Sequence, residues 1–314
     1  MKTIAYKEFG DTGVLQTQDE PKPAIQPDQI LVKVRAVSIN PLDWKIRKGE
    51  MKLMSGAKFP RHTGTDFAGI IEDAGPAVAN FKKGDEVFGM VKNNMKDGAL
   101  REYVAVSPTS VWKKPADITF NQAASIPTVG AAAVTALQKM GGVNSNSHIL
   151  IHGAGGGFGM FLLQLLKRMG ANTTAVTGTN AIGFAKRWGA HAVVDYKNEN
   201  VLSQRTTYDV IVDLSGKLGY KNAKQIMKPR ALFLNPVPKP LDILTTPVVN
   251  LFRGKKHLAL LTAPSQENID LLLNAIADGL EIEVSKVFPF AQAKEAYKYA
   301  EEGGYIGKVV IEVN

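Results

Sequence analysis

The first residues that could do chemistry form the octapeptide HGAGGGFG, residues 152–159, which carries five glycines in eight positions. It follows the apolar run HILIHG (148–153) and precedes FGMFLLQLLKRMG (158–170). The first run has the length and apolarity of a buried strand, and the second has the periodicity of an amphipathic helix. The glycines therefore occupy a strand-to-helix turn.

Small residues in such a turn have separate tasks when the turn binds a dinucleotide. Ala154 permits the tight turn, Gly156 lets the backbone approach a pyrophosphate, and Gly159 lets the helix pack against the strand. Amides at the helix start then face the phosphates, and the helix dipole adds to the attraction. The cofactor-binding residues predicted here are Ala154, Gly155, Gly156, Gly157, Phe158 and Gly159.

The second strand of such a unit ends in Thr177-Gly178-Thr179, and these three residues are also predicted to bind the cofactor. A carboxylate that would hold a ribose 2′-hydroxyl is expected about 20 residues after the glycines. No acidic residue lies between Gly159 and Asp195. Hydroxyls tolerate a 2′-phosphate that a carboxylate would repel, so the pattern favours NADPH. Lys186 and Arg187 are nearby cations that serve equally well as a solvated helix face.

Metal and thiol chemistry find little support in the sequence. The chain has no cysteine, which excludes disulfides, thiol nucleophiles and thiolate metal sites. His148 and His152 share one face of a predicted strand, but core histidines with satisfied partners are the commoner occurrence there. We therefore predict no metal site.

Composition indicates an ordinary globular protein of 314 residues, with 45% hydrophobic and 21% charged residues. The net charge of +9 is dispersed without an aromatic or basic reading motif, so we predict no nucleic-acid partner. No apolar stretch approaches the ~18 residues that would cross a bilayer, and MKTIAYKEFG lacks the apolar core of a secretory signal. We expect no membrane association and a cytoplasmic location.

The elements that must hold these residues fall into two regions. Up to about residue 120, short alternating or apolar runs bounded by turn residues predict a partly antiparallel β-barrel or sandwich. The runs are ILVKVRAVSI (30–39), FAGIIEDAG (67–75), GDEVFGMV (84–91) and ALREYVAVS (99–107).

After Pro127, strand and helix patterns alternate, which indicates a parallel sheet with helices on both faces. Further strands are predicted at 172–178, 192–196, 208–216 and 257–263, and further helices at 180–189 and 266–279. Gly170 and Gly189 lie where helix C-terminal caps belong. The segment 231–247 begins as a strand and then carries four prolines, so it is predicted to form a loop over the open end of the sheet.

Several local motifs together resemble the medium-chain dehydrogenase/reductase superfamily, and its zinc-free quinone oxidoreductase (zeta-crystallin-like) branch in particular. The resemblance covers nearly the whole chain, and the Asn-Pro-x-Asp run also resembles the reticulon-interacting members. The motifs are SINPLDWKIRKG (38–49), GTDFAG (64–69), FKKGDEVFG (81–89), DGALREYV (97–104), QAASIP (122–127), HGAGGGFG (152–159), GAHAVVDY (189–196) and GKVVI (307–311).

This resemblance implies an α/β fold with a GroES-like β-barrel catalytic domain and a Rossmann doubly wound parallel-sheet domain that binds NADP. We expect residues 1–121 and 266–314 in the first domain and 122–265 in the second. Zinc members place a Cys and a His where this chain has Asn40 and Thr65, which leaves Asp66 alone. One carboxylate cannot hold zinc tetrahedrally, so a metal-free enzyme is expected.

An enzyme without that Lewis acid suits acceptors that delocalise an incoming charge. The resemblance thus implies a hydride transfer from NADPH to a quinone or an α,β-unsaturated carbonyl as small-molecule substrate. A catalytically idle NADPH-binding or interaction protein of the same fold is the alternative. Relatives commonly dimerise through an edge strand, for which HLALLTA (257–263) is the candidate in an expected homodimer.

The resemblance also implies roles for single residues. Asn40 is expected at the nicotinamide and substrate site with Asp43 close behind it, and both are predicted to be catalytic. A capped turn in INPLDW is the other interpretation of these two residues. Tyr196 is expected beside the 2′-phosphate or is simply a strand-end aromatic. Ser215, Asn235 and Lys308 complete the predicted cofactor-binding residues.

Asp66 and Arg101 are expected to hold the barrel together rather than to react. Lys45 and Met51 depart from the tyrosines of bacterial quinone reductases, and Ala132 and Ile182 replace a common Thr and Lys. The acceptor site is therefore expected to differ from that of the best-known relatives.

Overall fold

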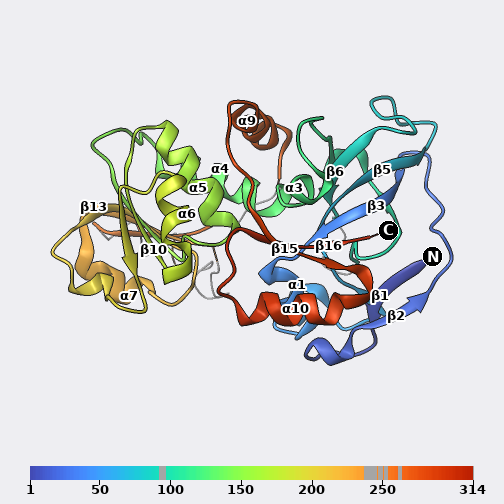
Figure 1. Cartoon of the computed structure of the whole chain (residues 1–314), viewed down its shortest axis with the longest axis horizontal. Helices are drawn as coiled ribbons and strands as arrows, with labels where there is room; N and C mark the ends of the chain where they lie inside the picture. The colour runs from blue at the N-terminus through green and yellow to red at the C-terminus, as the bar shows by residue number, and fades with distance from the viewer. Residues whose placement is uncertain (92–96, 237–245, 247–249, 251–253, 261–263, 314) are drawn as a thin grey trace. The chain divides into compact units, whose positions relative to one another are not determined.

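The computed structural model describes residues 1–91, 97–236, 246, 250, 254–260 and 264–313, and Figure 1 labels their elements along the chain. They form two compact units, one of Met1–Thr128 with Val284–Asn314 and one of Val129–Glu283. The two sections of the first unit are thus joined by the whole of the second.

These units differ from the predicted domains mainly at helix α9 (Gln266–Ala277), which the sequence-based division assigned to the first domain. Asn268 of α9 donates to Thr135 and accepts from Gln138, and both partners belong to helix α4 (Pro127–Met140). These contacts connect α9 with the second unit. The boundaries of independently folding domains stay a prediction.

The first unit is built mainly on antiparallel strands, with β15 and β16 as a parallel pair, which agrees with the predicted partly antiparallel structure. Among the described residues, a seven-stranded sheet has the order β15-β16-β3-β5-β6-β8 with β7 paired to β3, and a smaller sheet has the order β2-β1-β4. The strands are β1 (Lys2–Tyr6), β2 (Gln16–Asp19), β3 (Ile30–Ser38), β4 (Arg61–His62), β5 (Asp66–Ala74), β6 (Glu86–Met90), β7 (Tyr103–Val106), β8 (Val111–Lys113), β15 (Val284–Pro289) and β16 (Lys308–Glu312).

The apolar runs at 30–39 and 67–75 were predicted to be strands, and they form the central strands β3 and β5. The predicted strand 99–107 is shorter in the structure, because only Tyr103–Val106 pairs as a strand with β3 and Arg101 makes an isolated bridge to Thr3. The helices of this unit are α1 (Pro41–Arg47), α2 (Lys52–Ser55), α3 (Phe120–Ala124) and α10 (Ala293–Glu302), with 3-10 turns at Thr12–Val14, Pro108–Ser110 and Phe290–Gln292.

Strand β3 lies between β16 and β5, and its register decides which residues meet at its end. Val310 of β16 lies opposite Ser38, and Ser38 lies opposite Asp66 on the other side. Continuing the antiparallel register by two residues brings Lys308 opposite Asn40. The end of β3 is therefore flanked by a lysine from one neighbour and an aspartate from the other.

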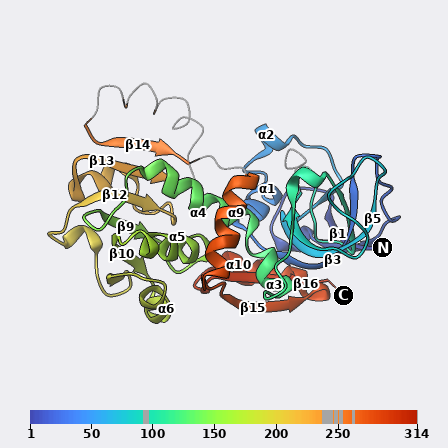
Figure 2. The same ribbon diagram turned by 90° about the horizontal axis from the view of Figure 1, so that it is seen from above.

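The second unit contains one parallel sheet of six described strands in the order β11-β10-β9-β12-β13-β14. This is the doubly wound Rossmann order. Figure 2 labels five of these strands, from β10 to β14. The strands are β9 (His148–His152), β10 (Asn172–Thr177), β11 (Ala192–Asp195), β12 (Tyr208–Asp213), β13 (Met227–Asn235) and β14 (Lys256–Ala259). Leu150, Ile211 and Phe233, from three adjacent strands, are fully or almost fully buried in its core.

Helices connect these strands as the alternating pattern predicted. Besides α4 and α9 they are α5 (Gly157–Arg168), α6 (Ile182–Arg187) and α7 (Tyr220–Ala223), with 3-10 turns at Thr179–Ala181, Val201–Ser203 and Lys224–Ile226. Gly170 and Gly189 follow α5 and α6 with φ of 71° and 107°. Their amides donate to Lys167 and Lys186 in the last helical turns, so both predicted caps are confirmed.

The predicted proline-rich loop falls mostly outside the described residues, since 237–245 and 247 are not among them. Strand β13 ends at Asn235, just before that segment. The end of the predicted strand 257–263 also lies outside the description, which gives Lys256–Ala259 for β14.

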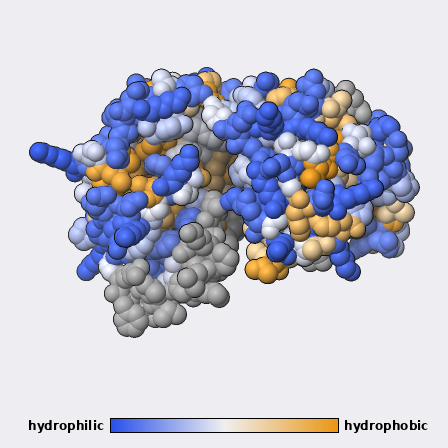
Figure 3. Space-filling model, turned by 90° about the horizontal axis from the view of Figure 1, so that it is seen from below, coloured by the Kyte–Doolittle hydropathy of each residue, from blue (hydrophilic) through white to orange (hydrophobic). Residues whose placement is uncertain are grey.

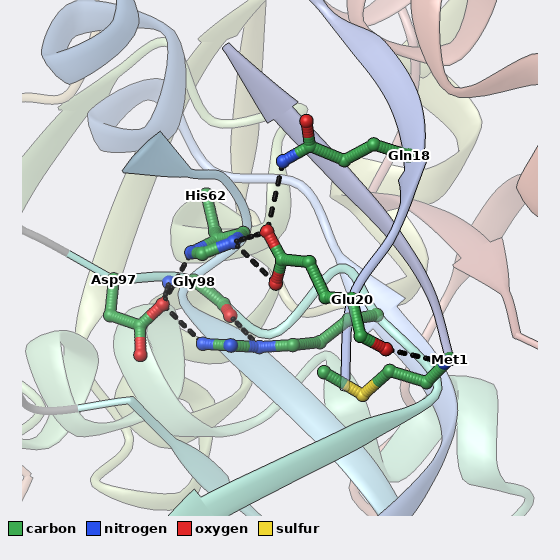
Figure 4. Close-up of polar contacts among 7 residues, drawn as sticks. Met1, Gln18, Glu20, His62, Asp97 and Gly98 are labelled. Atoms are coloured by element: carbon green, nitrogen blue, oxygen red, sulfur yellow. Dashed lines mark hydrogen bonds and ion pairs between the residues drawn. The ribbon is translucent and has the colours of Figure 1, made fainter. Parts of the chain in front are cut away.

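A group of charged residues ties the N-terminal segment to strand β4 and to Asp97 (Figure 4). The ring of His62 contacts Glu20 at 3.0 Å through Nε2 and Asp97 at 2.8 Å through Nδ1. Arg101 forms an ion pair with Asp97, and the N-terminal amine of Met1 donates to the carbonyl oxygen of Glu20. Arg101 therefore has the structural contacts that the sequence suggested.

The face shown in Figure 3 is mainly hydrophilic, and its apolar residues form smaller patches between charged ones. Leu53 and Met54 of α2 are the most exposed large apolar side chains described, at 94% and 65%. Within the described ranges, no helix combines the length and apolarity that a membrane span requires.

Candidate cofactor site and buried polar cluster

The glycine turn begins where β9 ends and is held against the neighbouring strand β10. The amides of Gly153 and Ala154 both donate to the carbonyl oxygen of Val176, at 2.9 and 3.0 Å. Gly153 has a φ of 88°, which a residue with a side chain rarely adopts, so a glycine is required there. The backbone then leads directly into α5 at Gly157.

Close packing explains two of the other glycines. A Cβ on Gly159 would overlap the carbonyl oxygen of Ala154, and one on Gly155 would lie 2.6 Å from Oγ1 of Thr177. Gly159 therefore lets the helix lie against the turn, as the sequence suggested. Gly156 differs, because a Cβ there would meet nothing within 4 Å. Its surroundings have room for a ligand.

The start of α5 offers hydrogen-bond donors to an anion. Its N-cap residue is Gly156, which has no side chain that could satisfy the first amides of the helix. These amides, with the positive end of the dipole of a 12-residue helix, suit a phosphate group. The turn therefore fits the pyrophosphate of a dinucleotide.

The remaining predicted cofactor residues of this unit gather along the same edge of the sheet. Parallel strands share their carboxyl edge, and an open sheet binds ligands there, where the strand order reverses. Here that point lies between β9 and β12. The residues at or just beyond the strand ends are Thr177, Gly178 and Thr179 after β10, Tyr196 after β11, Ser215 after β12 and Asn235 at the end of β13.

Ser215 is fixed beside the glycine turn by two neighbouring strand ends. Its Oγ donates to Asp213 at 2.8 Å and lies 2.7 Å from Nδ1 of His152, and it accepts from the amide of Lys217. Burial acts to raise the pKa of Asp213, but hydrogen bonds from His152, Gly219 and Ser215 outweigh it and lower that pKa. His152 thus has satisfied partners, although it is only partly buried.

The structure adds an acidic residue that the sequence argument did not place. Asp195 lies opposite Thr177 in the register of β10 and β11, and its Oδ2 accepts from Oγ1 of Thr179 at 2.6 Å. That bond is the first cause of a lowered pKa, so the carboxylate is ionised at neutral pH. The pairing of parallel strands brings Asp195 beside the end of β10. Tyr196, next in the chain, is 54% exposed, and its hydroxyl oxygen would lie 3.3 Å from a Cβ on Gly178.

The first unit contains a buried polar cluster that includes three predicted site residues. Lys308 donates from Nζ to Oδ1 of Asn40 at 2.6 Å and to the carbonyl oxygen of Ile39 at 2.9 Å. Nδ2 of Asn40 donates to Oδ2 of Asp66 at 3.0 Å. Thr128 donates to both carboxylate oxygens of Asp66 through its amide and its hydroxyl.

Asp43 belongs to the same cluster through the start of α1. Its Oδ2 accepts from the amide of Asn40 at 2.8 Å, and its Oδ1 accepts from Oγ1 of Thr65 at 2.6 Å. Asn40 is the N-cap of α1 and Asp43 its third residue, so the capped turn expected as the other interpretation is present. It is compatible with a functional role of the Asn40 side chain.

Burial shifts the ionisation of all three charged members of the cluster. It raises the pKa of Asp43 to about 6, although Thr65 and the Asn40 amide stabilise the carboxylate. It raises the pKa of Asp66 against the opposing effects of Lys308, Thr128 and Asn40. It lowers the pKa of Lys308 to about 8, since the two aspartates recover only part of the lost hydration. The cluster thus has groups that titrate on either side of neutral pH.

The cluster does not suit zinc. Both oxygens of Asp66 already accept hydrogen bonds, and Asn40 and Thr65 supply an amide and a hydroxyl in place of soft ligands. Across the described residues, no group of three or more His, Cys, Asp or Glu side chains is arranged to hold a metal ion.

The structure divides the predicted site residues between the two units. Asn40, Asp43 and Lys308 lie together in the first unit, and the other predicted cofactor residues line one sheet edge of the second. Asp66 and Thr128 are cluster members that the sequence did not assign to the site. The motif GTDFAG pointed to Asp66, whereas no local signal marked Thr128.

Comparisons with known proteins agree with this architecture. Residues 26–116 match the family described as "Alcohol dehydrogenase GroES-like domain", and residues 188–311 match "Zinc-binding dehydrogenase". The chain is 32% identical to the Bos taurus protein "NAD(P)H oxidoreductase RTN4IP1, mitochondrial", over 100% of this chain and 89% of that one. It is 30% identical to a "2-methylene-furan-3-one reductase" of Solanum lycopersicum, over 99% and 79%.

The solved structure of the quinone oxidoreductase from Coxiella burnetii is also similar. It superposes with a TM-score of 0.91 at 30% identity and covers 100% of this chain and 99% of that one. The GroES-like and Rossmann-type architecture expected from the sequence is thereby confirmed. The chain therefore belongs to the quinone oxidoreductase branch of the medium-chain dehydrogenase/reductase superfamily, a family of NAD(P)H-dependent oxidoreductases.

Proposed function

We propose that this protein is a zinc-independent reductase that uses NADPH to reduce a quinone or an α,β-unsaturated carbonyl compound. The observation that carries the proposal is the glycine turn at the head of α5. Its N-cap is a glycine with open space around it, at the strand order reversal of the sheet. Neither the backbone conformation nor the packing at Gly156 requires a glycine, so a ligand close to the backbone explains the missing side chain.

The preference for NADPH rests on the end of β10. Gly178 has no side chain, and Thr177 and Thr179 carry hydroxyls in place of a carboxylate. The single nearby acid, Asp195, is engaged by Thr179 and by Asn198. Gly156, Gly157 and the following amides would hold the pyrophosphate, and Tyr196 would lie against the adenosine part.

Bound NADPH supplies a hydride. The contribution that this chain makes is a donor for the oxygen on which negative charge develops. Asn40 has one N–H of Nδ2 directed to Asp66. We assign the second N–H of Nδ2 to such an oxygen. With this weak donor in place of a metal, acceptors that delocalise charge are favoured. The proton then comes from water or from a weak acid.

The names of two relatives support this class of acceptor: one is a quinone oxidoreductase and the other a "2-methylene-furan-3-one reductase". We keep the homodimer as part of the proposal, with edge strand β14 as its contact. The cytoplasmic location also stays a proposal, since relatives are named as mitochondrial or as chloroplast proteins.

The proposal is tested by mixing the purified protein with NADPH and following the absorbance of the reduced nicotinamide. A simple quinone is added first and a short-chain enal in a parallel sample, each with and without a chelator. Oxidation of NADPH that the chelator leaves unchanged is expected.

Each outcome has a distinct meaning. Binding of NADPH without oxidation by either acceptor would support the idle binding protein instead. Loss of activity in the chelator would contradict the metal-free reaction. A failure to bind NADPH at all would overturn the assignment of the glycine turn.

A further inference from the structure

We propose that Lys308 and Asp66 are positioning residues that fix the carboxamide of Asn40 in one orientation, so that Asn40 acts toward a ligand as a hydrogen-bond donor. The inference rests on the function proposed above, because it concerns what Asn40 offers to the reacting molecule.

The sheet itself places the three residues in a row. Asn40 follows the end of β3, Lys308 begins β16 on one side, and Asp66 begins β5 on the other. The antiparallel registers of these strands bring both charged residues to the end of β3. The arrangement therefore depends on the backbone pairing of the central strands and is held rigidly.

The two partners leave the amide only one orientation. An ammonium can only donate, and Oδ2 of Asp66 already accepts from the amide of Thr128, so it acts as an acceptor. Oδ1 of Asn40 accordingly faces Lys308 at 2.6 Å, and Nδ2 faces Asp66 at 3.0 Å. A flipped amide would direct N–H groups at the ammonium and an oxygen at Oδ2 of Asp66. The bond from the Lys308 ammonium is charge-assisted, which makes it stronger than a bond between neutral groups.

Lys308 and Asp66 thus form a clamp on the carboxamide of Asn40. Further hydrogen bonds of Asp66 and Lys308 keep this clamp in place. Asp66 is held by the amide and hydroxyl of Thr128, and Lys308 also donates to the carbonyl oxygen of Ile39. Asn40, Asp66 and Lys308 are 1%, 0% and 3% exposed. Buried hydrogen bonds in a row polarise one another, so the second N–H of Asn40 becomes a better donor.

The charge state of Lys308 then controls the clamp. Burial lowers its pKa to about 8, and the charged groups that act on it are Asp66 and Asp43. Loss of the proton above that pH leaves Oδ1 of Asn40 facing a neutral amine, which can accept as well as donate a hydrogen bond, so charge no longer fixes the orientation of the amide. Activity should therefore fall as the pH rises through this pKa.

The decisive experiment compares Lys308→Met, Asn40→Ala and the double variant. For each we would measure the Kd for NADPH by fluorescence titration, kcat and KM for the acceptor, and the pH profile of kcat. Lys308→Gln serves as the conservative variant, since its amide can still donate to Oδ1. Lys114→Met is the matched control, because the side chain of Lys114 is only 5% exposed and its ammonium binds other groups: the carbonyl oxygens of Pro115 and Ile118 and the carboxylate of Glu86.

We expect Lys308→Met to lower kcat by about tenfold to a hundredfold, to keep the Kd for NADPH within about threefold and to remove the alkaline decline. In the double variant kcat should equal that of Asn40→Ala, because Lys308 acts through Asn40. Lys308→Gln should recover part of the rate, and Lys114→Met should keep it. Fully additive losses, or a large loss of NADPH affinity with unchanged kcat, would overturn the inference.

A measurement without turnover separates this inference from the proposed reaction. The side-chain amide signals of Asn40 can be identified in ¹⁵N–¹H spectra by their absence in Asn40→Ala. They should move as pH rises through the titration of Lys308, and Lys308→Met should shift them and abolish that movement. If these shifts are observed but the protein is inactive with every acceptor, the proposed reaction is contradicted and the inference about Asn40, Lys308 and Asp66 still holds. Signals insensitive to Lys308 would overturn the clamp.

Discussion

Gly159 lies so close to Ala154 that a β-carbon on Gly159 would overlap the carbonyl oxygen of Ala154. The obstacle is backbone, which cannot move aside as a flexible side chain could. This contact sets how closely α5 lies against the turn that begins it. The third small residue of the motif thus has a packing role, and its predicted contact with the cofactor stays a prediction.

Gly159→Ala should therefore destabilise the protein by about 1–3 kcal/mol, the range for overpacking of a tight interior. Urea denaturation measures this change. Gly183→Ala in α6 is the control, because a Cβ there meets nothing within 4 Å. An equal stability of the two variants would show that the close contact can relax.

Gly156→Asp should leave the fold intact and weaken NADPH binding at least about tenfold, because a like charge at about 4 Å costs up to about 4 kcal/mol at an effective dielectric of about 20. Gly156 has a φ of −86°, which any residue can adopt. Gly156→Ala introduces bulk without charge and should bind more tightly than the Asp variant. Unchanged affinity of Gly156→Asp in a fluorescence titration would show that the pyrophosphate lies elsewhere.

Cofactor preference provides a third prediction. The wild-type protein should bind NADPH at least about tenfold more tightly than NADH, which corresponds to about 1.4 kcal/mol. Asp195→Asn should increase that ratio, since it removes a negative charge beside Thr179 and keeps a side chain of the same shape. The two dissociation constants for each variant give the answer. A ratio that falls on substitution would mean that Asp195 holds a ribose hydroxyl.

The contacts of His62 with Asp97 and Glu20 predict a pH-dependent stability. Burial alone lowers the pKa of His62, and Arg101 opposes its charge, but the hydrogen bonds to the two carboxylates prevail and the pKa is raised. The protonated ring therefore stabilises the folded state fully below the unfolded pKa of about 6.5, and this contribution is lost as pH rises through the folded pKa.

His62→Gln should lower stability by about 1–3 kcal/mol at mildly acidic pH and by less at alkaline pH. Denaturation midpoints across that range measure the difference between the two proteins. His191, on a separate unit, provides the control His191→Gln. A constant difference between wild type and His62→Gln at every pH would contradict the protonated pair.

Local patterns were sufficient to predict the strand, the turn and the helix that form the candidate cofactor edge. Strand, glycine turn and helix are consecutive in sequence, so Ala154, Gly156 and Gly159 could be assigned before their contacts were known. The ends of the following strands could be assigned because parallel strands share an edge. The predicted strands of the second unit and its helices α5, α6 and α9 are accordingly found, whereas no helix was predicted at α4 or α7.

The buried cluster depends on information that no local pattern contains. Asn40 and Lys308 are separated by 268 residues and meet through the register of β3 and β16. Lys308 was assigned to the cofactor alone for that reason, a role that stays a prediction beside the contacts found here. Strands such as QTQD (β2) were missed because they are short and polar.

Strand β16 pairs with β3 on one side and β15 on the other, although the whole second unit separates it from β3 in the sequence. The second unit is one continuous segment, so its described strands are all translated before β16. Until β16 is available, β7 pairs with residues 30–33 on that margin of β3, and residues 36–38 lack their partner. The large sheet of the first unit is therefore complete only when the segment that carries Lys308 has been translated.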